Sequence, residues 1–339
     1  MSFRAAIGTL IGKQSTILQS KTPHAKNFLA LPVLKNDFTL KSARSMQDLS
    51  IYKQVCKEQG WLLGKHDLEL FYATDPTGYY IGYLQDQPVS IFSFVKYGHG
   101  QLSIFGMLGV LQGFQNRGFM SVIRNFIGNK VHDKNMCAFA FAVPEVEENR
   151  VKNFEQFSMY TAWVDYEFTF EAKEAASILN DPLQSIALDL YQEPDFGKLL
   201  RYDSEVFNQP RRSFLETLVN LPSCTSIVAS IPGSGEIVGY CAIRETTDDE
   251  ICYFSPWFAN DVTIAQVLLK KAALFASERN DKIKFKSIMP CINEDGIKLV
   301  QMFSPQVDKH IRLCIGSIPE GFKNNSKKRV FGISSPCLG

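Results

Sequence analysis

The sequence of 339 residues lacks the signals of several common protein classes. No stretch reaches the roughly 18 to 20 consecutive apolar residues that a membrane-spanning helix needs. Its 36 Lys and Arg residues are balanced by 35 Asp and Glu, and a net charge of +1 argues against a protein that binds nucleic acid through its phosphates. We therefore expect no membrane and no nucleic acid among its partners.

Metal and disulfide signals are missing as well. None of the eight cysteines forms a CxxC pair, and no group of Cys and His has the spacing of a zinc site, so we expect no metal. Three of them, Cys137, Cys241 and Cys252, lie in apolar, strand-like runs. We interpret the cysteines as buried, reduced thiols of an intracellular protein.

The first 36 residues lack acidic side chains altogether. They carry several Lys and Arg, and Ser and Thr recur among them. This composition is typical of a mitochondrial transit peptide, and a basic, poorly ordered cytosolic tail is the alternative. We expect the mitochondrial matrix if residues 1–36 are a transit peptide, and the cytoplasm otherwise.

The rest of the chain has the composition of a folded globular protein, with 45% hydrophobic and 21% charged residues. Apolar periodicity predicts helices over 44–58 and 67–73, then strands over 79–84, 89–97 and 102–111. Short turns join the strands, which indicates an antiparallel meander. A helix over 119–131, a strand over 138–143, a helix over 145–157 and a strand over 166–171 follow.

A second series of similar order begins near residue 185. Helices are predicted over 196–207 and 213–221, strands over 226–230, 237–244 and 250–254, a helix over 263–277 and a strand over 283–289. The segments 80–94 and 226–243 look like the same hairpin used twice. We predict an α/β (α+β) fold of two tandem copies of one unit, each a mixed, mostly antiparallel sheet flanked by helices. The expected boundaries are a tail over 1–36, domains over 37–173 and 185–339, and a connector over 174–184.

The segment Val110 to Met120, VLQGFQNRGFM, carries the main functional signal. It joins a predicted strand to a predicted helix, and the first N–H groups of a helix have no intrahelical partner. Together with the helix dipole they make a site for an anion such as a pyrophosphate. Gly118 allows a close approach of the backbone to that anion. The segment has neither GxGxxG nor GKS/T, although another class of nucleotide-binding α/β protein stays an alternative.

This arrangement resembles the GNAT acyltransferase superfamily over roughly residues 38 to 172. The family fingerprint is Val-x-Pro followed by Arg/Gln-x-x-Gly-x-Gly/Ala, and Val110, Gln115 and Gly118 match it. Gln112 and Met120 depart from it, and Met120 is expected either to crowd the pyrophosphate or to point into the core. The resemblance implies that acetyl-CoA or another acyl-CoA binds between the fourth and fifth strands, against Leu108, Gly109, Val110, Gln115, Asn116, Arg117, Gly118, Phe119 and Met120.

The resemblance also implies a catalytic base and a catalytic acid. The fourth strand lacks the Glu of many members, so Glu147, with Glu145 and Glu148 beside it, is the candidate base, acting through a water. These residues are equally consistent with an acidic first turn that stabilises its helix. Phe154 stands at the position where members of the family often have a Tyr that acts as the catalytic acid. A Phe side chain has no proton to donate. Tyr160 is the candidate catalytic acid in its place if the helix continues or bends. The alternative is a structural role, in which Tyr160 packs at the domain core with its hydroxyl at the rim.

Residues 185 to 339 resemble the YitH-like GNAT domain of two-domain proteins, through the string Tyr253 to Phe275, which has no Gly-rich loop. The resemblance implies a degenerate second domain. The whole chain is then expected to be an N-acyltransferase that passes an acyl group directly from acyl-CoA to a small-molecule or peptide amine in a ternary complex. A non-catalytic GNAT-fold module that binds CoA or a partner is the alternative.

Overall fold

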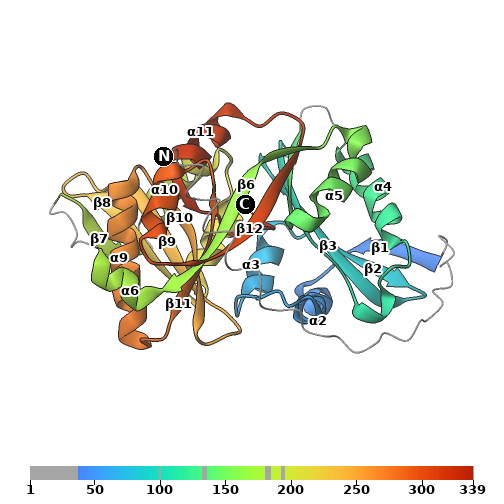
Figure 1. The fold of residues 1–339 in the computed structure, drawn as a ribbon, viewed down its shortest axis with the longest axis horizontal. Coiled ribbons are helices and arrows are strands. Elements are labelled where there is room, and N and C mark those ends of the chain that lie inside the picture. The colour runs from blue at the N-terminus through green and yellow to red at the C-terminus, as the bar shows by residue number, and fades with distance from the viewer. Residues whose placement is uncertain (1–36, 99–100, 132–135, 180–184, 192–194, 339) are drawn as a thin grey trace. The chain divides into compact units, whose positions relative to one another are not determined.

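The computed structural model describes residues 37–338 except 99–100, 132–135, 180–184 and 192–194 (Figure 1). All described residues belong to one compact unit, Val33–Gly339. The predicted transit peptide, residues 1–36, lies outside the described residues. No helix among the described residues is long and apolar enough to cross a membrane.

The first half contains the predicted meander. Strands β1 to β4 pair antiparallel in chain order, and β5 then pairs parallel to β4. Helices α2 and α3 precede β2, and α4 joins β4 to β5. The bounds are β1 (Phe38–Ser42), α2 (Ser50–Gln59), α3 (Asp67–Thr74), β2 (Tyr79–Leu84), β3 (Gln87–Tyr97), β4 (Leu102–Val110), α4 (Phe119–Val131) and β5 (Cys137–Ala142).

The second half repeats this order, which confirms the predicted repeat. Two helices precede an antiparallel meander, a helix follows, and the next strand is parallel to the last strand of the meander. The bounds are α7 (Phe196–Phe207), α8 (Arg212–Asn220), β8 (Cys224–Ile231), β9 (Glu236–Glu245), β10 (Ile251–Ala259), α9 (Val262–Arg279) and β11 (Lys284–Pro290). Strand β10 therefore corresponds to β4, and β11 corresponds to β5.

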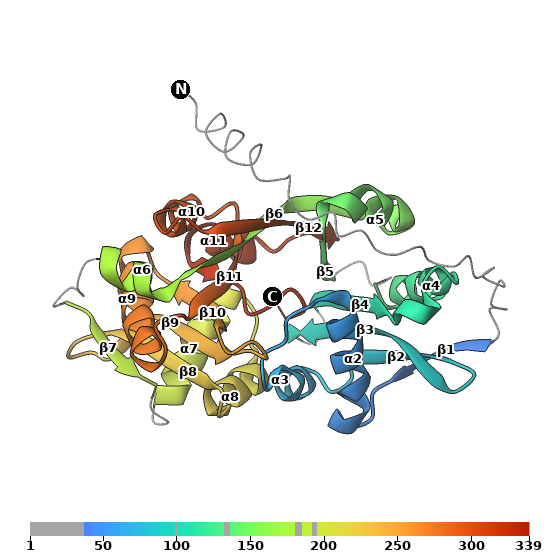
Figure 2. The same cartoon turned by 60° about the horizontal axis from the view of Figure 1, so that its bottom comes forward.

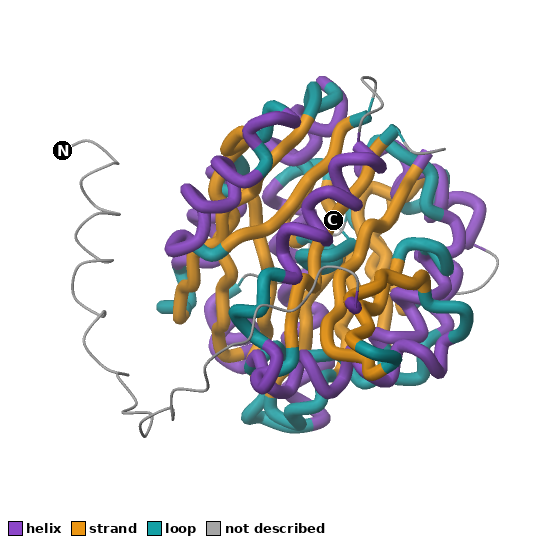
Figure 3. The backbone as a smooth tube through the Cα atoms, turned by 90° about the vertical axis from the view of Figure 1, so that its right-hand side faces the viewer, coloured by secondary structure: helices purple, strands orange, loops and turns teal. Residues whose placement is uncertain are grey.

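One sheet runs through both halves (Figures 1 and 3). Its strand order is β1-β2-β3-β4-β5-β12-β6-β11-β10-β9-β8-β7, and β13 (Val330–Gly332) pairs with β10. Strand β12 (Gln306–Ile315) comes from the second half, yet it lies between β5 and β6 (Tyr160–Glu171). Each half thus supplies a strand that pairs with strands of the other half. The structure confirms the predicted fold class, a mixed α/β fold with a mostly antiparallel sheet.

Several predicted elements differ in extent. The helix over 145–157 is divided into η5 (Pro144–Val146), α5 (Glu147–Asn153) and η6 (Glu155–Phe157), and Ser158 ends it at φ 58°. Strand β6 begins at Tyr160, six residues before its predicted start at Tyr166. The segment predicted as a connector contains most of α6 (Ala172–Ile178), and β7 (Ala187–Leu190) follows it. The domain boundaries themselves stay a prediction.

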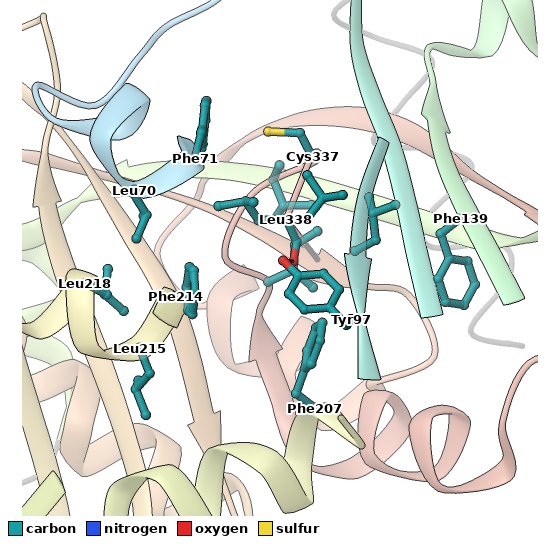
Figure 4. Close-up of a cluster of buried hydrophobic side chains, with 14 of the residues drawn as sticks. Leu70, Phe71, Tyr97, Phe139, Phe207, Phe214, Leu215, Leu218, Cys337 and Leu338 are labelled. Atoms are coloured by element: carbon teal, nitrogen blue, oxygen red, sulfur yellow. Dashed lines mark hydrogen bonds between the residues drawn. The ribbon is translucent and has the colours of Figure 1, made fainter. Parts of the chain in front are cut away.

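Three hydrophobic clusters hold the sheet to its helices. One packs α4 through Phe119, Ile123 and Ile127 onto one face of the first half. A second packs α9 onto the second half. The third lies on the opposite face and joins residues of both halves, including Tyr97, Phe214 and Leu338 (Figures 2 and 4). The two halves therefore share a core as well as a sheet.

Candidate cofactor site

The parallel pair β4 and β5 separates part of the way along its length. Leu102 to Phe105 pair with Cys137 to Ala140, and the recorded pairing stops there. At that point β4 also has a bulge, because its register with β3 shifts by one residue and Met107 takes φ 45°. Among the described residues, 106–109 thus have no strand partner on the β5 side, and an edge of this kind suits an extended ligand that carries amide groups.

The loop after β4 opens directly into α4. Gly118 has φ +82°, and a Cβ built there meets no atom within 4 Å. The absent side chain therefore leaves open space beside the helix N-terminus, next to the N–H groups of Phe119 and Met120, while the Ser121 N–H already donates to the Gly118 carbonyl at 3.2 Å. Phe119 is buried and its ring stacks on Phe38 with centroids 4.3 Å apart, which fixes the start of the helix. The fold thus supplies the geometry of an anion site.

Met120, which departs from the family fingerprint, is 40% exposed. It does not point into the core, so one of its two predicted placements is excluded. Its neighbour Phe119 takes the buried position instead. The Met120 side chain is left on the outer side of the first turn, where an unbranched thioether can move aside for a ligand.

Polar contacts fix the shape of the loop. The Gln112 N–H donates to Glu58 Oε2 at 2.8 Å, and Gln115 Nε2 donates to the Val110 carbonyl at 3.4 Å. Arg117 Nη2 donates to the Gly113 carbonyl at 2.9 Å, and its guanidinium lies 4.9 Å from the centre of the Phe114 ring. The loop therefore holds one positive charge in place. Asn116, at φ 62°, is exposed beside it.

Leu108, Gly109 and Val110 occupy the end of β4 as predicted. Gly109 is buried, whereas Leu108 and Val110 are partly exposed. A Cβ on Gly109 would lie 2.4 Å from Val55 Cγ1, so the glycine lets α2 pack closely against the strand. The role of Gly109 seen here is this close packing with α2.

Glu147, the candidate base, is the first residue of α5 and is partly buried. Its Oε1 accepts a hydrogen bond from Thr161 Oγ1 at 2.5 Å, so β6 fixes the carboxylate. Glu145 and Glu148 on either side are exposed. Phe154 is a core residue that is 2% exposed, which agrees with its lack of a transferable proton.

Tyr160, the candidate acid, is not on a continued helix, because Ser158 ends η6 and Tyr160 begins β6. Its hydroxyl donates to the Gly316 carbonyl at 3.1 Å. Partial burial and a hydrogen bond with Cys314 raise the pKa of this phenol. Tyr160 pairs with Cys314, which pairs with Phe139, so it lies level with the closed part of the β4–β5 pair. The catalytic roles of Tyr160 and Glu147 stay predictions.

The equivalent features of the second half are filled by the chain itself. Asp261 caps α9, and its Oδ1 accepts from the N–H groups of Thr263 at 2.8 Å and Ile264 at 3.0 Å. A carboxylate of the protein thus occupies the position that an anionic ligand would take. This agrees with the absence of a Gly-rich loop there.

Strand β13 fills the gap between β10 and β11. These strands pair from Ile251 to Tyr253 only, and β10 then has a bulge between Phe254 and Trp257. Past that bulge, Trp257 and Phe258 pair with Gly332 and Val330 of β13. The Ile333 N–H reaches across to the Ile288 carbonyl of β11 at 2.9 Å. The second copy therefore shows an extended backbone held in the gap that is open in the first.

Sequence reasoning missed a buried polar group beside the gap. Arg312 of β12 is 1% exposed, and its Nε donates to Asp165 Oδ2 at 2.8 Å. Trp163 Nε1 donates to Asp165 Oδ1 at 3.0 Å, and the guanidinium lies 4.0 Å from the centre of the Phe141 ring. Because β12 begins with charged residues, its sequence does not predict a strand, and the cluster of Arg312, Asp165 and Trp163 is therefore not predicted either. Among the described residues no group of His, Cys, Asp and Glu could hold a metal ion.

The architecture and the open gap define a tandem GNAT fold, and comparison with known proteins agrees. Residues 199–301 match the family model described as an acetyltransferase (GNAT) domain. A putative acetyltransferase from Pyrococcus horikoshii has a similar structure, with a TM-score of 0.67 and 15% identity, over 94% of this chain and 100% of that one. A tandem GNAT protein from the clavulanic acid biosynthesis pathway gives 0.58 and 11% identity, over 84% and 99% of the two chains.

A curated relative is similar in sequence. Holothin acyltransferase from Pseudoalteromonas sp. (strain SANK 73390) is 24% identical over 210 residues, which is 60% of this chain and 64% of the relative. The match thus spans less than two thirds of that relative. Part of the second half thus matches the GNAT acetyltransferase model, and the chain has the fold of tandem GNAT proteins. The likeness of the second half to YitH-like domains stays a prediction.

Proposed function

We propose that this protein is an N-acyltransferase that uses acyl-CoA, with acetyl-CoA as the expected donor and a small-molecule or peptide amine as acceptor. The observation that carries the proposal is the open gap between β4 and β5, which ends at an open helix N-terminus beside Gly118. The acyltransferase relative supports the same class of reaction. The acceptor and the ternary-complex mechanism belong to the proposal.

The residues present fit such a cofactor. The pyrophosphate is anionic, and Gly118 leaves room for it beside the first turn of α4, next to the charge of Arg117. The pantetheine arm carries two amides, and residues 106–109 lie beyond the part of β4 that pairs with β5, where a strand edge could accept such an arm. When bound, acyl-CoA supplies an activated thioester. The N–H groups at the β4 bulge are the chain's donors for the thioester oxygen.

Proton transfer is assigned to the chain's own groups. Glu147 is held by Thr161 and would accept the proton of the acceptor ammonium through a water. Tyr160 is the candidate donor to the leaving thiolate, because a phenol is protonated at neutral pH. The absence of an acidic side chain from Gly106 to Leu111 favours a second candidate, a module that binds CoA without turnover.

Calorimetry with CoA and acetyl-CoA tests the proposal, using Gly118→Glu as the diagnostic variant. The substitution places bulk and negative charge in the open space beside α4, and we expect at least about a hundredfold weaker binding. Gly233→Glu is the matched control, because Gly233 also has a positive φ, +87°, and open space around its Cβ, but lies in the β8–β9 turn. Equal binding by the wild type and both variants would exclude the site.

Turnover separates the two candidates. An amine panel is incubated with acetyl-CoA and the release of free thiol is followed. The enzyme candidate is supported if the wild type and Gly233→Glu release thiol and Gly118→Glu does not. Binding of CoA without release across the panel favours the module.

We also propose import into mitochondria. Residues 1–36 support it, because they combine several Lys and Arg with no Asp or Glu. Fusion of these residues to a fluorescent protein tests it, and a diffuse cytoplasmic signal would contradict it.

A further inference from the structure

The segment after β13 passes from the second half to the β4 bulge of the first. Residues 334–338 are buried or nearly so, and Leu338 is 0% exposed. Their core position is shown in Figure 4, where Cys337 and Leu338 lie in the cluster shared by the halves. These residues belong to neither repeat, so they have a separate place in the fold.

Buried charges anchor the start of this segment. Arg244 Nη2 donates to the Ser334 carbonyl at 2.6 Å, and Arg211 Nη1 donates to Ser334 Oγ at 2.9 Å. Arg244 pairs with Asp67 and Arg211 with Asp203, and all four side chains are buried. A segment held by two buried ion pairs does not move aside without exposing or unpairing those charges.

The end of the segment is anchored in the first half. The Tyr97 hydroxyl donates to the Leu338 carbonyl at 2.8 Å. A Cβ placed on Gly106 would lie 3.1 Å from the Cβ of Cys337 and 3.6 Å from the Pro336 carbonyl oxygen. Gly106 thus lacks a side chain where the segment crosses β4. It is also the first residue of β4 past the pairing with β5, at the closed end of the gap.

We propose that residues 334–338 form the end wall of the acyl pocket and restrict the donor to a short acyl group, acetyl or propionyl. The inference rests on the proposed function, which brings a thioester to the closed end of the gap. A ligand arm that enters at Gly118 and follows β4 meets the Pro336 carbonyl and the Cα and Cβ of Cys337 at Gly106. A longer acyl chain would have to displace a segment fixed at both ends.

The test measures the affinity of acyl-CoAs by calorimetry, which needs no knowledge of the acceptor. The wild type is compared with Cys337→Gly using CoA, acetyl-CoA, butyryl-CoA and hexanoyl-CoA. We expect the wild type to bind butyryl-CoA about tenfold or more weakly than acetyl-CoA. Cys337→Gly should reduce the ratio of the butyryl-CoA to the acetyl-CoA dissociation constant by about tenfold, and it should leave the affinity for CoA unchanged.

Two controls isolate the size of the side chain. Cys337→Ser keeps the volume and should keep the wild-type ratio. Cys241→Gly removes an equally buried cysteine from the second half and should also keep it. Cys337→Ala, a milder truncation, should change the ratio in the same direction as Cys337→Gly if the latter does not fold.

The outcomes separate the inference from the proposed function. A wild type that binds acetyl-CoA and hexanoyl-CoA equally well overturns the end wall and leaves the cofactor site intact. The same holds if folded Cys337→Gly and Cys337→Ala both retain the wild-type ratio. A wild type that fails to bind CoA itself contradicts the proposed function.

Discussion

At the scale of single residues, buried charge distinguishes the centre of this molecule from its surface. Asp165 and Arg312 are 0% and 1% exposed, and they connect β6 to β12 across the junction of the two halves. The pair Lys173–Asp281 has a similar separation, 3.1 Å, but its side chains are 66% and 63% exposed. Desolvation makes the loss of one buried partner far more costly than the loss of an exposed one.

Asp165→Asn therefore has a strong predicted effect on stability. The substitution leaves the Arg312 guanidinium buried without a counter-charge, so we expect the free energy of unfolding to fall by about 3 to 5 kcal/mol. Asp281→Asn is the matched control and should cost less than about 1 kcal/mol. Urea denaturation followed by circular dichroism measures both. Equal losses in the two variants would show that the buried pair contributes no more than a surface pair.

At the scale of elements, the two gaps differ in what occupies them and in how the following helix begins, since Gly118 leaves the start of α4 open and Asp261 caps α9. The gap between β4 and β5 is open along residues 106–109, whereas the gap between β10 and β11 holds β13. In both halves the strand before the gap has a bulge close to where the parallel pairing ends. The repeat thus kept the geometry of a cofactor gap in both halves and left room for a ligand in one.

From the proposed cofactor site we predict a stoichiometry of one CoA per chain. Strand β13 already hydrogen-bonds the edge of β10, and Asp261 already caps α9, so the equivalents of the first-half gap and helix N-terminus are both occupied in the second half. Calorimetric titration or native mass spectrometry gives the number directly. Two equivalents bound at low micromolar concentration would mean that β13 leaves its place or that the cofactor binds elsewhere.

The elements that the sequence predicted are those with unbroken periodicity. The hairpins β2–β3 and β8–β9 and the long helix α9 have apolar patterns over most of their length. Strand β12 was missed because its exposed start, Gln306 to Lys309, is polar and Arg312 interrupts its apolar end. Helix α11 (Glu320–Lys328) has little apolar pattern to predict it, because it buries only Phe322 and Ser326.

Only the part of the candidate site that is contiguous in sequence could be predicted. The strand–Gly118–helix segment is contiguous, so its pattern can be read directly from the sequence. The contact of Cys337 with Gly106 joins residues more than two hundred positions apart, and no spacing rule reveals it. The exchange of β12 and β6 is equally non-local, because it depends on which strands the completed sheet brings together.

At the scale of the whole molecule, that exchange makes the halves interdependent. Strand β5 pairs with β4 for only four residues and with β12 for five, from Ile311 to Ile315. Removal of the second half would therefore leave β5 with a long unpaired edge and remove Leu338 and Cys337 from the shared core. An exposed apolar edge of this kind favours aggregation.

We predict that the fragment 37–184 does not fold alone, although it contains the whole predicted first domain and its CoA loop. Expressed by itself, it should be insoluble or lack a cooperative unfolding transition, and it should not bind CoA. Co-expression with the fragment 185–339 should restore a soluble complex, because β12 then pairs again with β5 and β6. Size-exclusion chromatography, thermal melting and calorimetry with CoA measure these properties. A monomeric fragment 37–184 that melts cooperatively and binds CoA as tightly as the full chain would show that the exchanged strand is dispensable for the fold.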